Sequence, residues 1–132
     1  MREMAMVFSH EGKALFWLGP RGHTEGSIPD SEILWQRIWS NRAEIGGVAH
    51  THPWDGKPGP SHTDVTTWDA IERALGKRML WPIVSMTDVV FYVRNPLTGE
   101  FVETPSTFAG QKDWLEIVEE LRRTSRGLLE RT

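Results

Sequence analysis

The chain of 132 residues contains no cysteine. Disulfide bonds and cysteine-ligated metal sites are therefore excluded, and any metal ion would have to be bound by histidine and carboxylate side chains. The sequence also lacks a long hydrophobic run, because the apolar residues 4–8 are followed at once by the polar residues 9–13. We therefore expect neither a signal peptide nor a membrane-spanning segment, and a cytoplasmic location is the default expectation.

An excess of positive charge is missing as well, since 15 Lys and Arg residues stand against 18 Asp and Glu residues, a net charge of -3. Proteins that bind nucleic acid usually carry a basic excess or stripe, so we expect no nucleic-acid partner and no membrane partner. The length matches one domain, which we assign to residues 1–125, with residues 126–132 expected to form a frayed C-terminal tail.

Hydrophobic periodicity and turn residues predict an α+β domain with a mixed, mostly antiparallel sheet flanked by helices. Two adjacent glycines, Gly46 and Gly47, predict that another segment packs closely against the backbone of their strand. The expected strands are residues 4–8, 14–18, 45–52, 79–86, 89–94 and 100–103, and the expected helices are residues 28–40, 61–75 and 113–122.

The informative segment of the sequence is His50-Thr51-His52-Pro53, followed after a loop rich in Pro and Gly by Ser61-His62-Thr63-Asp64. Residues two apart on a strand point to the same face, so both imidazoles can be directed at one point. Asp64, at the start of the next helix, can supply a third ligand. Two His and one carboxylate leave a fourth position for water, which is the open arrangement of a catalytic zinc site.

Each half of this pattern also has a structural interpretation. A His-x-His pair on a strand is most often structural or exposed, and Ser61-x-x-Asp64 before an apolar helix resembles a capping box. The two interpretations are compatible, because a cap would fix Asp64 in the first helical turn, where the ligand is needed. The combination of the two halves is what favours a metal site.

The combined motif resembles that of the JAB/JAMM family, the MPN-domain zinc metalloproteases, and in particular that of its bacterial members. The family signature is an upstream Glu, then His-x-His-Pro, a short loop and Ser-x-x-Asp; the loop here is one residue longer than usual. The resemblance implies the family's cytidine-deaminase-like fold, with zinc bound by His50, His52 and Asp64. It also implies that Ser61 donates a hydrogen bond to the oxyanion formed when water attacks the scissile amide.

The family uses a glutamate at the start of the first hairpin strand as general base, and Glu3 matches that place in this sequence. Family members usually have a helix before this residue, whereas the sequence here starts almost at it. Glu25, in a Gly-rich loop, and Glu11 are the alternatives, of which Glu25 is the better.

Trp54 directly follows the His-x-His-Pro turn, and we expect it either to wall a substrate groove or to pack its own loop. His62 is expected to be exposed or to lie just outside the ligands. The remaining tryptophans fall mostly on apolar faces, where core packing explains them best: Trp17, Trp35, Trp39, Trp68, Trp81 and Trp114.

By this resemblance the leading functional prediction is a zinc-dependent isopeptidase or peptidase that uses zinc-activated water. Its substrate would be an amide bond at the C-terminal tail of a ubiquitin-like or sulfur-carrier protein. The alternative is a non-catalytic MPN scaffold that binds protein partners. A different His-x-His metalloenzyme, such as a metallo-β-lactamase-like or amidohydrolase fold, needs further ligands spread over a longer chain and is less favoured.

Overall fold

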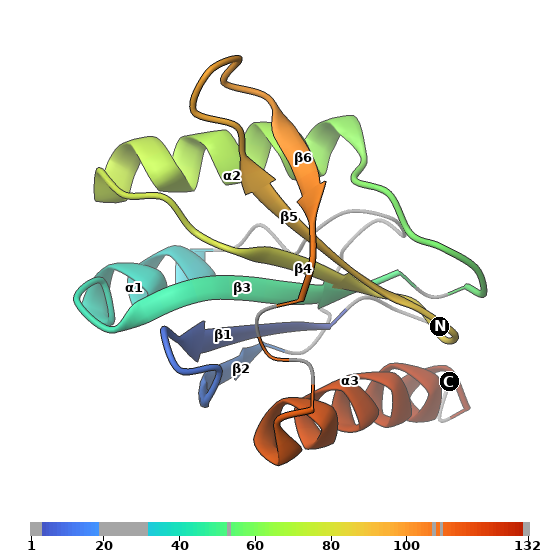
Figure 1. Ribbon diagram of the computed structural model, residues 1–132. Helices are drawn as coiled ribbons and strands as arrows, with labels where there is room; N and C mark the ends of the chain where they lie inside the picture. Colours follow the sequence, from blue (N-terminus) through green and yellow to red (C-terminus); the bar gives the residue numbers. More distant parts are fainter. Residues whose placement is uncertain (1–3, 19–31, 53, 107, 109, 131–132) are drawn as a thin grey trace.

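The computed structural model describes residues 4–18, 32–52, 54–106, 108 and 110–130, which form one sheet with three helices (Figure 1). Six strands lie side by side in the order β2-β1-β3-β4-β5-β6, and of their pairings only β3 with β4 is parallel. The α+β class and the mixed, mostly antiparallel sheet are therefore confirmed. The elements are β1 Ala5–Ser9, β2 Ala14–Leu18, α1 Glu32–Ser40, β3 Ile45–Thr51, α2 His62–Leu75, β4 Trp81–Val84, β5 Val89–Arg94, β6 Phe101–Thr104 and α3 Lys112–Glu130.

The period-two alternation of the strands sends side chains to two different cores. Along β1, Ala5 and Val7 join a cluster with α1 and α2, whereas Met6 and Phe8 join a cluster with α3. Figure 1 shows the corresponding arrangement, with α3 on one side of the sheet and α2 on the other. A central strand such as β3 is consequently covered on both faces.

The two glycines predicted to permit close packing do so. A Cβ atom on Gly47 would lie 1.9 Å from the backbone oxygen of Leu80, and one on Gly46 would lie 2.7 Å from that of Ser9. Any side chain here would push apart the backbones on either side of β3. Gly46 and Gly47 therefore allow β3 to lie between β1 and the segment that leads into β4.

The structure differs from the sequence-based expectations at three places. Helix α3 continues to Glu130 instead of ending at Arg122, and Ser125 is fully buried in this additional part. The expected strand 79–86 is shorter, since its last two residues form the turn before β5. Trp39 is 53% exposed, with the guanidinium of Arg42 4.3 Å from the centre of its ring, so it does not pack in a core. No helix within the described ranges is long and apolar enough to cross a membrane.

Candidate metal centre

Strand β3 positions both histidines in the interior of the protein. His50 lies between Ala5 of β1 and Ile83 of β4, and its side chain is fully buried. His52 follows the last residue of the strand, is 2% exposed, and donates its backbone N–H to the carbonyl of Val84 over 2.9 Å. Both imidazoles lie on the sheet face that α2 covers, where the ring of Trp68 is 6.3 Å from that of His50.

The third side chain is positioned by the N-terminus of α2. Ser61 is the N-cap, in an extended conformation, and its hydroxyl accepts the backbone N–H of Asp64 over 3.0 Å. In return, Oδ2 of Asp64 accepts the backbone N–H of Ser61 over 2.9 Å. The predicted capping box is therefore confirmed, and it holds the fully buried Asp64 carboxylate against the two imidazoles.

Three potential ligand atoms meet at this point. Nε2 of His50 lies 3.1 Å from Nε2 of His52, and each of these atoms lies 3.3 Å from Oδ2 of Asp64. Ligands at about 2.0–2.1 Å from a tetrahedral zinc ion stand about 3.3–3.4 Å from one another. The triangle thus has the dimensions of one face of such a tetrahedron, and the buried group can bind a metal ion.

The donor set also fits a cation better than it fits a set of hydrogen bonds alone. If both Nε2 atoms carry protons and donate to Oδ2 of Asp64, two N–H groups face each other across 3.1 Å. If either atom is unprotonated, its lone pair is directed at the carboxylate. A cation between the three atoms would instead receive a lone pair from each of them.

The electrostatics of the pocket favour the protonation states that ligands require. Burial lowers the pKa of the His50 imidazole, and the attraction of Asp64 opposes this effect without reversing it. Burial acts to raise the pKa of the Asp64 carboxyl, but its contacts with His50, His52 and the Ser61 N–H outweigh burial and lower that pKa. A neutral imidazole and an ionised carboxylate are the forms that bind metals.

Trp54 lies beside the three ligands. Its ring is 4.7 Å from that of His52 between centroids, tilted by 41°, and the residue is 43% exposed. Its backbone is fixed on both sides, because its N–H donates to the carbonyl of His52 and its carbonyl accepts from Met86. Trp54 therefore exposes an aromatic surface next to the candidate metal centre; whether a substrate uses it stays a prediction.

Other predicted site residues have different outcomes. His62 is exposed, as expected. Glu11 lies past the end of β1 that pairs with Ile45, roughly 13 Å or more along the strand from the Ala5–His50 pair, so it is wrong as an alternative general base. Glu3 and Glu25 lie outside the described residues. Met4 exchanges hydrogen bonds with Thr51, its N–H donating to the Thr51 hydroxyl and its carbonyl accepting the Thr51 N–H.

Sequence reasoning missed Ser85 and Thr87, which form hydrogen bonds with the loop that contains Trp54 and Gly56. The hydroxyl of the fully buried Ser85 donates to the carbonyl of Gly56 over 2.6 Å, and the N–H of Gly56 donates to the hydroxyl of Thr87 over 2.7 Å. Both partners lie in the turn between β4 and β5, about thirty positions away in sequence. No local pattern around Ser85 or Thr87 signals this contact.

Comparison with known proteins adds no assignment to this geometry. No protein-family model matches the chain, and a search of curated proteins finds no match either.

Proposed function

We propose that this chain is a zinc-dependent peptidase or isopeptidase that hydrolyses an amide bond at the C-terminal tail of a ubiquitin-like or sulfur-carrier protein. The observation that carries the proposal is the buried triangle of two imidazole nitrogens and one carboxylate oxygen, with sides of 3.1, 3.3 and 3.3 Å. The resemblance of its sequence motif to the JAMM signature supports the substrate class.

The donor set supports zinc as the metal, because two His and one carboxylate with an open position are typical of catalytic zinc. The same set also suits iron, so the identity of the metal is part of the proposal. When bound, zinc would supply a Lewis acid that lowers the pKa of a water towards ~7. His50, His52 and Asp64 would hold the ion.

The hydrogen bonding of Ser61 supports a second function for its hydroxyl. Its Oγ uses a lone pair to accept the Asp64 N–H, which leaves the hydroxyl proton available to donate. The residue is only half-buried, at the point where the cap meets the site. In the proposed reaction this proton would be donated to the oxyanion of the tetrahedral intermediate.

Glu3 is the proposed general base, taking a proton from water and passing it to the leaving amine. It directly precedes Met4, whose hydrogen-bond partner Thr51 stands between His50 and His52 in sequence. Glu25 is the second candidate for this role.

The first test is elemental analysis of protein purified without chelator, comparing the wild type with His52→Ala, Asp64→Ala and the matched control His62→Ala. We expect about one zinc per chain in the wild type and in His62→Ala, and almost none in the other two variants. A folded wild-type protein without metal would overturn the proposal and favour a partner-binding scaffold.

Activity is tested on ubiquitin-like proteins that carry a C-terminal peptide extension, with cleavage followed by mass spectrometry. We expect cleavage by the zinc-loaded wild type. The cleavage rate should fall at least 10²-fold in the variant that removes the general base, which is either Glu3→Gln or Glu25→Gln. A protein that binds zinc but cleaves none of these fusions would keep the metal site and reject the proposed substrate class.

A further inference from the structure

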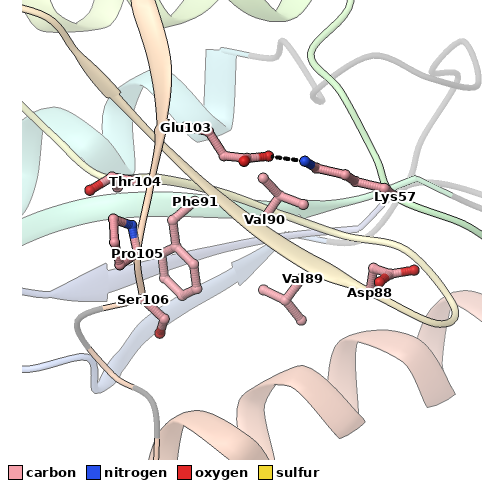
Figure 2. A pocket seen from close by; sticks show the side chains of 9 residues that line it. All are labelled: Lys57, Asp88, Val89, Val90, Phe91, Glu103, Thr104, Pro105 and Ser106. Carbon is pink, nitrogen blue, oxygen red and sulfur yellow. Dashed lines mark ion pairs between the residues drawn. The ribbon is translucent and has the colours of Figure 1, made fainter.

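A groove of about 450 Å³ opens at the β5–β6 edge of the sheet, and none of the three candidate metal ligands lines it. Figure 2 shows the ion pair of Lys57 and Glu103 on one side of β5, with Phe91 and Ser106 on the other. The groove therefore wraps around the edge of a strand. That edge is the first part of β5, formed by Val89 and Val90, where β6 no longer runs alongside.

The strand register explains why this edge is open. β6 pairs with β5 from Phe101 opposite Arg94 to Thr104 opposite Phe91, and then ends before Pro105. A longer β6 would have brought Ser106 opposite Val89. Instead the chain turns towards α3 (Figure 1), which leaves the first residues of β5 without a neighbour on that side among the described strands.

The hydrogen-bond pattern shows which way the backbone of Val89 faces. The N–H of Ser85 donates to the carbonyl of Asp88, so these two residues form a hydrogen-bonded pair across the β4–β5 turn. Such pairs alternate along an antiparallel ladder, which makes Val84 opposite Val89 a non-hydrogen-bonded pair. The N–H and carbonyl of Val89 thus point away from β4 and into the groove.

The position of Pro82 in β4 agrees with this alternation of hydrogen-bonded and non-hydrogen-bonded pairs. This residue has no N–H and lies opposite Phe91, the next non-hydrogen-bonded position along the ladder. Phe91 therefore also turns its backbone groups away from β4, and these groups meet Thr104 of β6. Val89 has the same orientation, but no hydrogen bond outside the sheet ladders joins it to another described residue.

The lining indicates the chemistry of an occupant. The partly buried Val89 offers an apolar surface on the α3 side of the sheet, next to the buried Phe91. On the opposite side, the carboxylate of Asp88 accepts a hydrogen bond from the Thr87 hydroxyl and forms no ion pair with any described residue. Lys57 and Glu103 neutralise each other, so the groove carries a net charge of about -1.

We propose that this open edge of β5 binds an extended peptide segment of a partner protein by strand addition, antiparallel to β5. One peptide residue would exchange two backbone hydrogen bonds with Val89 and direct an apolar side chain to the face of the sheet on which the Val89 side chain lies. The next peptide residue lies opposite Asp88 on the other face, where a Lys or Arg complements its charge. The recognised pattern is therefore an apolar residue followed by a basic one.

The test uses the ¹⁵N-labelled protein and three acetylated, amidated pentapeptides, followed by NMR. The first is Val-Lys-Thr-Thr-Thr, which begins opposite Val89 and so does not overlap the pairing of Thr104 with Phe91. The second has Glu in place of Lys, and the third has an N-methylated Val that cannot donate to the ladder. We expect the first peptide to shift the amide signal of Val89 and to slow its hydrogen exchange. The N-methylated peptide should lose both effects.

Asp88→Lys should weaken binding of the Lys peptide about two- to five-fold and strengthen binding of the Glu peptide by a similar factor, the range of an exposed ion pair. Glu100→Lys, which makes the same charge change at an exposed position outside the groove lining, is the matched control and should leave both affinities unchanged. The proposal is overturned if the Val89 signal does not respond, or if all three peptides act alike. A Val89 shift that depends on protein concentration without peptide would also overturn it, because a second copy would then occupy the edge.

Discussion

The two faces of the sheet are built by the same alternation of side chains but filled with different chemistry. On the α3 face the buried cluster is apolar, and its centre is a group of four aromatic rings with centroids 5.2–6.2 Å apart: Phe8, Phe91, Phe108 and Trp114. The face covered by α1 and α2 buries ionisable groups among its apolar ones. They include His50, Asp64 and Glu72.

This difference supports the proposal that the α2 face carries the function. Buried polar groups cost stability unless other groups satisfy them, so a fold gains nothing from them by packing alone. Glu72 is satisfied inside the protein, since its carboxylate accepts from the indole of Trp81 and from the guanidinium of Arg94. The two histidines and Asp64 form a cluster that fits a cation, and we infer that the α2 face is the one that metal binding stabilises.

The largest effect is expected from Asp64→Ala, which removes one ligand from the α2 face. Wild-type protein should be stabilised by zinc, by about 4 kcal/mol when free zinc is a thousand times the Kd. The variant should lose this zinc-dependent part completely. Chemical denaturation in the presence of zinc and in the presence of chelator measures the zinc-dependent part of the stability for each protein. Asp113→Ala, a matched change in the first turn of α3, should cost about 0.3–1 kcal/mol and keep the zinc effect.

A comparably large change on the opposite face should affect folding alone. Trp114→Ala removes a 3%-exposed ring that contacts three other aromatic residues, and should cost about 3–5 kcal/mol of unfolding free energy. The zinc content of the molecules that remain folded should stay near one per chain. If zinc is lost while the fold persists, the two faces are coupled and the proposed division between them is wrong.

Much of the fold follows from local sequence patterns. Short apolar runs separated by turn residues predict the β1–β2 hairpin and β5, which the structure contains. The helix expected to end at residue 75 ends there, and Gly76 follows in a left-handed conformation, with φ of 66°. The end of α3 was not predictable in this way. Polar residues and Gly127 interrupt the apolar pattern after Arg122, and the burial of Ser125 arises from tertiary packing that the local pattern does not encode.

The candidate site was predictable to the extent that it is local in sequence. His50 and His52 share a face because they are two apart on a strand, and Asp64 is oriented by a cap residue only three positions before it. The hydrogen bonds between Gly56 and the hydroxyls of Ser85 and Thr87 join segments far apart in sequence, so only the folded structure reveals them. The cytidine-deaminase-like fold and the role of Glu3 stay predictions.

A smaller loss of stability is expected when the buried Glu72 on the α2 face loses its ion-pair partner Arg94. Arg94→Ala leaves the 5%-exposed Glu72 without its cation, although Trp81 and the N–H of Met79 still donate to it. We expect a loss of about 1–3 kcal/mol, measured by urea unfolding. Arg73→Ala removes an exposed partner of Asp69 and should cost under about 0.5 kcal/mol. Equal losses in the two variants would mean that the Glu72–Arg94 pair stabilises no more than a surface pair.

Apart from the control variants, the smallest loss of stability is expected for Ser61→Ala, which separates two roles of one hydroxyl. The cap bond to the N–H of Asp64 disappears, which should cost about 1 kcal/mol. The three ligands remain, so zinc content should not change.

If the Ser61 hydroxyl also donates to an oxyanion, cleavage should fall about 10²- to 10³-fold, far more than the lost cap explains. Ser61→Thr keeps both the cap and the donor and should restore most of the activity. A decrease in cleavage no larger than the change in zinc occupancy would assign Ser61 to the cap alone, and the α2 face would then contribute ligands but no donor to the proposed reaction.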